Sequence, residues 1–422
     1  MDAQQQDGRR YTQPAADTRP AVDAVERLPW AALVTMALTV LVVVSGEMMP
    51  TAVLPAMATD LDVSLARAGL LVSAWAATVV VASFPLTRLT ARLDRPTVIA
   101  GALTVFGVAT LVTATADTYG SAMASRLVAA GATGLLWSTI NAHAASIVPE
   151  QRIARATAIV LFGGMLGTVA AIPAGNAVAE LAGWRAPFAG IGVLGLIAAV
   201  AVVVVLQRYP VVVGDDDDKV AATSSRRALW PVLATAGVGG LLLVAHFAPF
   251  TFVAELLEPS AVPTPVLLLL FGLVGAGGVG FVGVTSDRYP TGVLVVVALA
   301  MAISLSGLPA LGHHGAVDVL VIAVWGLAVG AVGPAVQARV MALAGSEHRA
   351  TAGTLMPVAM NLGLALGAAA GSGAVALWST AALPLLALAP ALLAVIGSVL
   401  LGRGVPSRHK AGHRADLARS TA

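Results

Sequence analysis

The sequence predicts an all-α membrane protein with twelve transmembrane helices, arranged as two parallel-repeat bundles of six helices each. Three observations support this prediction. Of the 422 residues, 58% are hydrophobic and 11% are charged, and the mean hydropathy is +0.88, whereas soluble domains carry about 25% charged residues. Twelve apolar runs are long enough to cross a bilayer, and the basic residues lie almost entirely on one side of those runs.

Each run holds about 20 residues or more, which is the length that a helix needs to span the hydrocarbon core. Because a bilayer admits only helices or closed barrels, and these runs are too long for barrel strands, we expect helices. The runs lie near residues 30–54, 68–87, 97–116, 119–145, 156–179, 186–206, 228–252, 263–285, 291–311, 316–342, 351–377 and 380–402.

The distribution of basic residues predicts the orientation of the chain. If the N-terminus is inside, 21 of the 24 lysines and arginines lie in inside segments, and only Arg67, Arg126 and Arg185 lie elsewhere. Cytoplasmic loops carry this excess in membrane proteins. We therefore expect a multi-pass protein of the cell (inner or plasma) membrane with both termini in the cytoplasm.

The longest internal polar segment divides the chain into two halves. It contains an acidic stretch at residues 215–218, which is typical of a solvated linker. The N-terminal tail is not expected to be a secretory signal, because the apolar run after it is too long for a signal core. The expected segments are a cytoplasmic tail (1–29), a six-helix bundle (30–206), a cytoplasmic linker (207–227), a second bundle (228–402) and a basic cytoplasmic tail (403–422).

The two halves carry matching features at one spacing. Residues 283–288, after the eighth run, fall 196 positions after residues 87–92, which follow the second run. With an even number of helices in each unit, both units have the same orientation in the membrane, which gives parallel halves. The same offset separates two pairs of glycines, Gly167 from Gly363 and Gly175 from Gly371.

Two charged residues lie deep within predicted helices. Glu47 is about 25 Å along the first helix, and Arg126 lies at a similar depth on the fourth. Such residues usually face the interior of a membrane protein and pair, directly or through water. An acid held beside an arginine can exchange its proton when access switches sides, so Glu47 and Arg126 are the candidate proton-coupling residues. The alternative is that each reaches the lipid headgroups separately.

Helical periodicity places further residues beside this pair. Met36 and Val40 lie on the Glu47 face, and Thr133 and Trp137 lie on the Arg126 face. They predict a mostly apolar substrate cavity that suits a lipophilic cargo, although ordinary helix packing explains the stripe equally well. Three polar residues of other helices are also candidates for this cavity, with packing or interhelical hydrogen bonding as the alternative: His246, Gln337 and Asn361.

The motifs that are missing narrow the chemistry. The sequence has no nucleotide-binding Gly-x-x-x-x-Gly-Lys-Ser/Thr and no His-Glu-x-x-His. No nucleophile and base pair is apparent. There is also no cysteine, which excludes disulfides and thiolate metal sites. We therefore expect no enzyme activity, no catalytic residue, no metal and no cofactor, with a proton gradient as the energy source.

Several segments, taken in order, resemble the major facilitator superfamily, specifically its twelve-helix drug:proton antiporter branch, which includes chloramphenicol-type, sugar and purine efflux permeases. The resemblance covers about residues 35 to 400. It rests on Gly46-Glu47 with Leu54-Pro55 and Asp60-Leu61, on Arg126 with Ala130 and Gly134, on Pro173-Ala174-Gly175, on Gly183-Trp184-Arg185-Ala186-Pro187-Phe188, on Gly283, Asp287 and Arg288, and on Asn361-Leu362-Gly363.

The resemblance implies that Glu47 and Arg126 are coupling and substrate residues. It also implies conformational motifs that contain Arg92, Arg95, Gly167, Pro173, Gly175, Gly283, Asp287 and Arg288. Two departures weaken the match. Ala91 and Asp94 stand where the first loop motif usually has an aspartate and a glycine, and Ile172 stands where a glycine often precedes the proline.

The expected function is proton-coupled export of a small lipophilic or amphipathic molecule, such as a drug, antibiotic or metabolite, by alternating access. The alternatives are a sugar or nucleoside exporter of the same fold, an importer, or a non-transporting membrane receptor or scaffold. The expected partners are a small-molecule substrate, protons and the lipid bilayer, with no nucleic acid. The chain is expected to work as a monomer.

Overall fold

A computed structural model describes residues 28–149, 152–209, 226–286 and 289–403 of the chain. Within these ranges the protein is helical and has no strand. Residues 1–27 and 404–422 of the two predicted tails and residues 210–225 of the predicted linker lie outside the described residues. The elements are α2 (Trp30–Asp60), α3 (Leu65–Leu89), α4 (Arg95–Ala114), α5 (Tyr119–Ser146), α6 (Ile153–Leu166), η2 (Gly167–Ala171), α7 (Ile172–Ala182), α8 (Arg185–Leu206), α9 (Arg226–Phe250), α10 (Val253–Leu257), α11 (Thr264–Thr285), α12 (Pro290–Gly307), η3 (Leu308–Ala310), α13 (Gly315–Leu377), η4 (Thr380–Ala382) and α14 (Leu383–Arg403).

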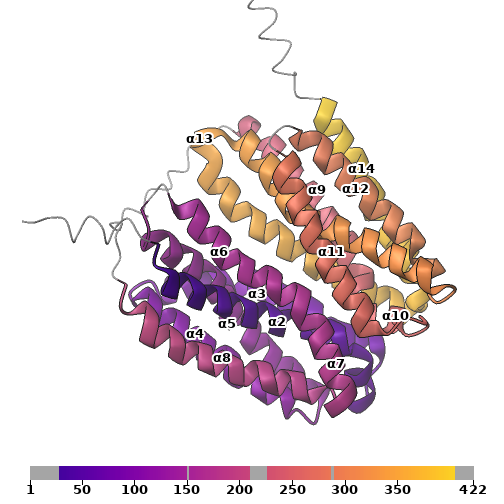
Figure 1. Cartoon of the computed structure of the whole chain (residues 1–422), viewed down its shortest axis with the longest axis horizontal. Helices are drawn as coiled ribbons and strands as arrows, with labels where there is room; N and C mark the ends of the chain where they lie inside the picture. Colours follow the sequence, from indigo (N-terminus) through magenta and orange to yellow (C-terminus); the bar gives the residue numbers. More distant parts are fainter. Residues whose placement is uncertain (1–27, 150–151, 210–225, 287–288, 404–422) are drawn as a thin grey trace, which may run out of the picture.

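The helices form two bundles that lie side by side. Figure 1 shows α2 to α8 in indigo to pink on one side and α9 to α14 in orange to yellow on the other. In the described chain, eleven helical segments are long and apolar enough to cross a membrane. The twelfth span is α5, which is more polar and packs inside the first bundle against α3 and α4. The all-α membrane fold is therefore confirmed, with eleven of the twelve predicted spans meeting this length and hydropathy.

The predicted break between spans ten and eleven separates the two spans Gly315–Val340 and Val358–Leu377. Helical conformation continues through it, so that α13 covers 63 residues and includes both spans. The chain nevertheless reverses its direction between the two spans. A Cβ on Gly333 would lie 3.4 Å from the Met360 side chain, whereas a straight helix would separate these residues by about 40 Å.

The predicted repeat is visible in how glycines pack. A Cβ on Gly167 would lie 2.8 Å from the Leu41 carbonyl oxygen of α2, and one on Gly363 would lie 2.6 Å from the Gly240 carbonyl oxygen of α9. In both bundles, therefore, the fifth span packs closely on the first span through a glycine at the same repeat position. Small residues permit this close approach in membrane bundles. The parallel-repeat prediction is confirmed by this shared geometry.

The span that contains Pro173 includes a π-helical turn. This turn, η2, covers Gly167–Ala171 and joins α6 to α7 in a span that continues to Ala182. Proline has no backbone N–H to donate within the helix, and a π turn is one way in which a helix accommodates such a loss. The turn also touches the other bundle, because a Cβ on Gly272 of α11 would lie 2.7 Å from the Val169 Cα.

The two bundles also meet through a small apolar cluster where α2 ends and α3 begins. Phe252 lies at its centre, and a Cβ on Gly69 of α3 would lie 2.6 Å from that ring. Because α2 begins at the opposite end of the bundle, this contact is on the side away from Trp30. The buried members of this cluster are Leu54, Ala58, Ala68, Phe252, Ala374 and Leu383.

Candidate functional site

Arg126 of α5 is the most deeply buried charged group of the first bundle, with a 2% exposed fraction. Its guanidinium donates one hydrogen bond to the Gly46 carbonyl oxygen (3.1 Å) and another to the Glu47 carbonyl oxygen (3.2 Å) of α2. Its Nε is buried without a partner. Arg126 therefore joins α5 to the backbone of α2 at the turn that carries Glu47.

Two aromatic rings cover the same guanidinium. Its central carbon lies 4.2 Å from the centroid of the Trp75 ring of α3 and 5.9 Å from that of Phe188 of α8. A cation over an aromatic face is attracted by the quadrupole of the ring, and more strongly when water is excluded. Helices α2, α3, α5 and α8 thus converge on one buried charge.

We expected Glu47 and Arg126 to pair directly or through water, and the structure shows no direct ion pair between them. Both residues are described, and Arg126 binds the main-chain oxygen at Glu47 rather than its carboxylate. The reason is geometric, since Arg126 reaches α2 on the side of Gly46, which packs against Phe106 and Ile191 inside the first bundle. The Glu47 side chain is half-buried. The two residues lie at the same depth, and Arg126 contacts the turn of α2 that carries Glu47. The Glu47 carboxylate accepts none of the hydrogen bonds of Arg126.

A small apolar cavity lies between α2 and α5, and Val43 on its wall is one helical turn before Glu47. Its volume is about 10 Å³, which is space for about one water molecule. Val40 and Trp137 were predicted to line a shared cavity, and the structure brings them together here. Met36 and Thr133 are buried nearby but do not line it. The wall is made by Thr39, Val40, Val43, Leu136, Trp137 and Ile140.

In the second bundle, His246 of α9 lies inside a cluster of aromatic rings. The centroid of its ring is 4.5 Å from that of Phe250, 6.1 Å from that of Phe271 and 5.5 Å from that of Trp325. The histidine Nδ1 and the Trp325 Nε1 are both buried without a hydrogen-bond partner. Buried polar atoms usually have partners, so these two nitrogens are exceptions inside an aromatic cluster.

The remaining predicted residues lie apart from these clusters. Gln337 is exposed, and Asn361 is half-buried. Arg92 is exposed, whereas Arg95 donates to the Ala142 carbonyl oxygen at 3.3 Å and so joins the start of α4 to α5. Gly283 faces open space, and Asp287 and Arg288 lie outside the described residues. In the described ranges, no three His, Asp or Glu side chains gather as a metal site requires.

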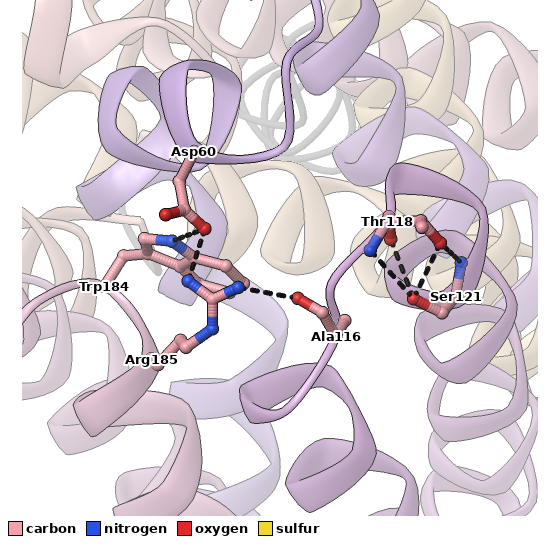
Figure 2. A network of polar contacts seen from close by, with 6 residues as sticks. All are labelled: Asp60, Ala116, Thr118, Ser121, Trp184 and Arg185. Atoms are coloured by element: carbon pink, nitrogen blue, oxygen red, sulfur yellow. Dashed lines mark hydrogen bonds and ion pairs between the residues drawn. The ribbon is translucent and has the colours of Figure 1, made fainter.

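A polar network closes the first bundle at the end opposite to Trp30 (Figure 2). Asp60, at the end of α2, pairs with Arg185 and accepts a hydrogen bond from the Trp184 indole at 3.2 Å. Arg185 also donates to the Ala116 carbonyl oxygen at 2.8 Å. Trp184 contacts Phe188, with 5.9 Å between ring centroids. The network is therefore linked by packing to the ring that covers Arg126.

The sequence reasoning missed the aromatic partners of both clusters. Trp75 and Arg126 lie at similar depths on neighbouring spans, and this match could have indicated their contact. Phe271 falls 196 positions after Trp75. The repeat offset alone could therefore have predicted an aromatic ring at the same position in each bundle.

Comparisons with known proteins agree with this architecture. The family model of the Major Facilitator Superfamily matches residues 36–368. The inner membrane transport protein YdhP of Escherichia coli (strain K12) is 29% identical over 333 residues, which cover 78% of this chain and 85% of that protein. A solved bacterial homolog of the human lysosomal transporter Spinster, in an inward-facing and unoccupied conformation, has a TM-score of 0.67 at 15% identity, over 88% of this chain and 94% of that one.

Proposed function

This chain belongs to the major facilitator superfamily and is a multi-pass membrane transporter, and from that premise we propose that it is a proton-coupled exporter of small lipophilic or amphipathic molecules. It works by alternating access of the two bundles to a site between them. Glu47 binds the proton, and Arg126 fixes the geometry of the turn that carries it. Both termini face the cytoplasm, in the inner membrane of the cell.

The observation that carries this proposal is the arrangement of Glu47 and Arg126. A buried arginine is costly in a membrane, and here two carbonyl oxygens and two aromatic rings stabilise it. Because both terminal nitrogens of the guanidinium donate to main-chain oxygens, the Glu47 carboxylate is not held by them in an ion pair and can gain or lose a proton. Movement of the two bundles during the cycle changes the side of the membrane from which the carboxylate beside this fixed charge is accessible, and so couples protonation to conformation.

The side chains around the candidate residues favour lipophilic cargo over sugar. Near Glu47, five of the six residues between α2 and α5 that line the one-water void are apolar, and His246 in the second bundle is surrounded by rings. A sugar needs several convergent hydrogen-bonding groups, whereas an apolar site with few polar atoms suits an amphipathic aromatic molecule.

The test is transport by purified protein in inside-out proteoliposomes with an acidic lumen. Three radiolabelled probes are compared: chloramphenicol, ethidium and lactose. We expect uptake of at least one of the first two, driven by the pH gradient and accompanied by proton release, and no uptake of lactose. Uptake of lactose alone would favour the sugar exporter. If no probe shows uptake that is coupled to proton movement, the proposal is contradicted.

Glu47→Gln is the decisive variant. It should abolish gradient-driven uptake, while exchange of labelled for unlabelled probe across the membrane without a gradient continues, because exchange does not require a proton to leave. Loss of both activities would indicate a folding defect rather than lost coupling, and thermal unfolding in detergent separates these cases. Gradient-driven uptake at the wild-type rate would rule out Glu47 as the proton carrier.

A further inference from the structure

A groove on the outer face of the first bundle, between α2 and α6, is separate from the clusters described above. Its volume is about 530 Å³. Its floor is the close contact of the two helices, where a Cβ on Gly163 would collide with the Ala37 carbonyl oxygen. The walls are two helical stripes, Trp30, Val34, Ala37, Leu38 and Leu41 on α2 and Arg155, Ala158, Ile159, Phe162, Gly163 and Leu166 on α6.

The walls are apolar and exposed. The exposed fractions are 46% for Val34, 55% for Leu38 and 53% for Phe162. Contiguous exposed apolar surface marks a site of contact with another molecule or with lipid. In a membrane protein, apolar side chains alone suit any acyl chain, so the charge at the end of the groove decides which lipid is preferred.

That charge is Arg155, near the start of α6. It is exposed, and no described carboxylate pairs with it. Trp30, which is 52% exposed, lies at the start of α2. Because α2 and α6 run in the same direction, both residues lie at the same end of the groove. Trp and Arg at the end of a span are typical of the level of the lipid headgroups.

We propose that this groove is a binding site for one anionic phospholipid, with an acyl chain between α2 and α6 and the phosphate group on Arg155. The cation and the apolar walls together complement a lipid of this chemistry. A basic residue near the membrane surface favours anionic lipid about fivefold. Because α6 continues into η2, which touches α11 of the other bundle, a bound lipid contacts a span that takes part in the bundle interface.

The test is native mass spectrometry of the full chain in detergent, with phosphatidylglycerol or phosphatidylcholine of matched acyl chains added at equal concentrations. We expect one bound phosphatidylglycerol with an affinity about fivefold higher than that of phosphatidylcholine. Arg155→Gln should remove this preference but keep weak binding of both lipids. Ala158→Phe fills the groove and should reduce binding of both lipids severalfold.

Two controls match these variants. Arg88→Gln removes an exposed arginine that lies over Phe84, outside the groove, and Ala369→Phe enlarges an exposed alanine on α13. Neither should change lipid binding. Equal affinity for the two lipids in the wild type, or equal effects of Arg155→Gln and Arg88→Gln, would overturn the proposal. The proposal would also be overturned if lipid bound only after residues 1–27 were removed, because that segment would then be the occupant of the groove.

Discussion

The guanidinium of Arg126 lies 4.2 Å from the centroid of the Trp75 ring, inside the first bundle and away from bulk solvent. Trp75 has a 1% exposed fraction, so the contact is desolvated on both sides. In this position the ring does two things. It fills the space between α3 and α5, and it stabilises a charge that would otherwise depend on two backbone carbonyl oxygens and the more distant Phe188 ring.

The first prediction follows from this contact. Trp75→Leu should lower the free energy of unfolding by about 2–4 kcal/mol, because it removes packing volume and a cation–π interaction of about 2 kcal/mol. Trp75→Phe should cost about half as much, since a ring remains over the cation. Thermal and denaturant unfolding in detergent measures both changes.

The matched control for Trp75 is Trp30→Leu. Trp30 is 52% exposed, so its replacement should change the free energy of unfolding by less than about 0.5 kcal/mol. If Trp75→Leu is no more destabilising than Trp30→Leu, the ring does not stabilise Arg126.

The second prediction concerns the ion pair of Asp60 and Arg185. The two side chains are 45% and 36% exposed, respectively, so water and salt screen their attraction. A double-mutant cycle with Asp60→Asn and Arg185→Gln should give a coupling energy below about 1 kcal/mol, and less at high salt. A coupling of several kcal/mol that is independent of salt would show that this pair is buried in the working protein.

The general fold could be predicted from the sequence because bilayer physics leaves few choices. Length and hydropathy predicted the spans. The repeat offset matched Gly167 with Gly363, and in the structure each of them packs on the first span of its own bundle. The helical conformation between the two spans of α13 could not be predicted, since the polar residues there look like a loop when only hydropathy is considered.

The candidate site was predictable only in part. Depth along the helices placed Glu47 and Arg126 at one level, which the hydrogen bond to the Glu47 carbonyl oxygen confirms. Which atom of Glu47 the arginine meets depends on how α2 is rotated about its axis. That rotation is set by close packing, such as that of Gly46 against Phe106, and a sequence pattern does not reveal it.

The third prediction concerns pH and Asp94, which lies before the first residue of α4. The Thr97 backbone N–H donates to its carboxylate at 2.9 Å, and this hydrogen bond holds the pKa of Asp94 below the ordinary value of 3.8. A carboxyl whose pKa is lowered by folding stabilises the protein above its unfolded pKa. That stabilisation is lost as the pH falls through the lower, folded pKa.

Asp94→Ala should therefore cost about 0.5–2 kcal/mol near neutral pH, as expected for a lost helix cap. The difference between this variant and the wild type should shrink below about pH 4, where the carboxyl becomes protonated. Asp94→Asn keeps an uncharged cap and should not show this loss at low pH. Unfolding midpoints from pH 3 to 7 provide the measurement. If the stability difference between Asp94→Ala and the wild type grows as the pH falls, the predicted direction of the pH dependence is wrong.

The last prediction tests the close contact of α2 and α6 with a pair of glycines. Gly163→Ala would place a Cβ against the Ala37 carbonyl oxygen, whereas Gly101 of α4 has nothing within 4 Å of its Cβ position. Overpacking typically costs about 1–3 kcal/mol, while alanine at an unobstructed helical position is favoured over glycine by about 0.5–1 kcal/mol. In thermal unfolding, Gly163→Ala should therefore lower the midpoint and Gly101→Ala should leave it unchanged or raise it. The Ala37 carbonyl belongs to the backbone and cannot move aside as a flexible side chain can. Equal midpoints for the two variants would therefore mean that α2 and α6 are farther apart than in this structure.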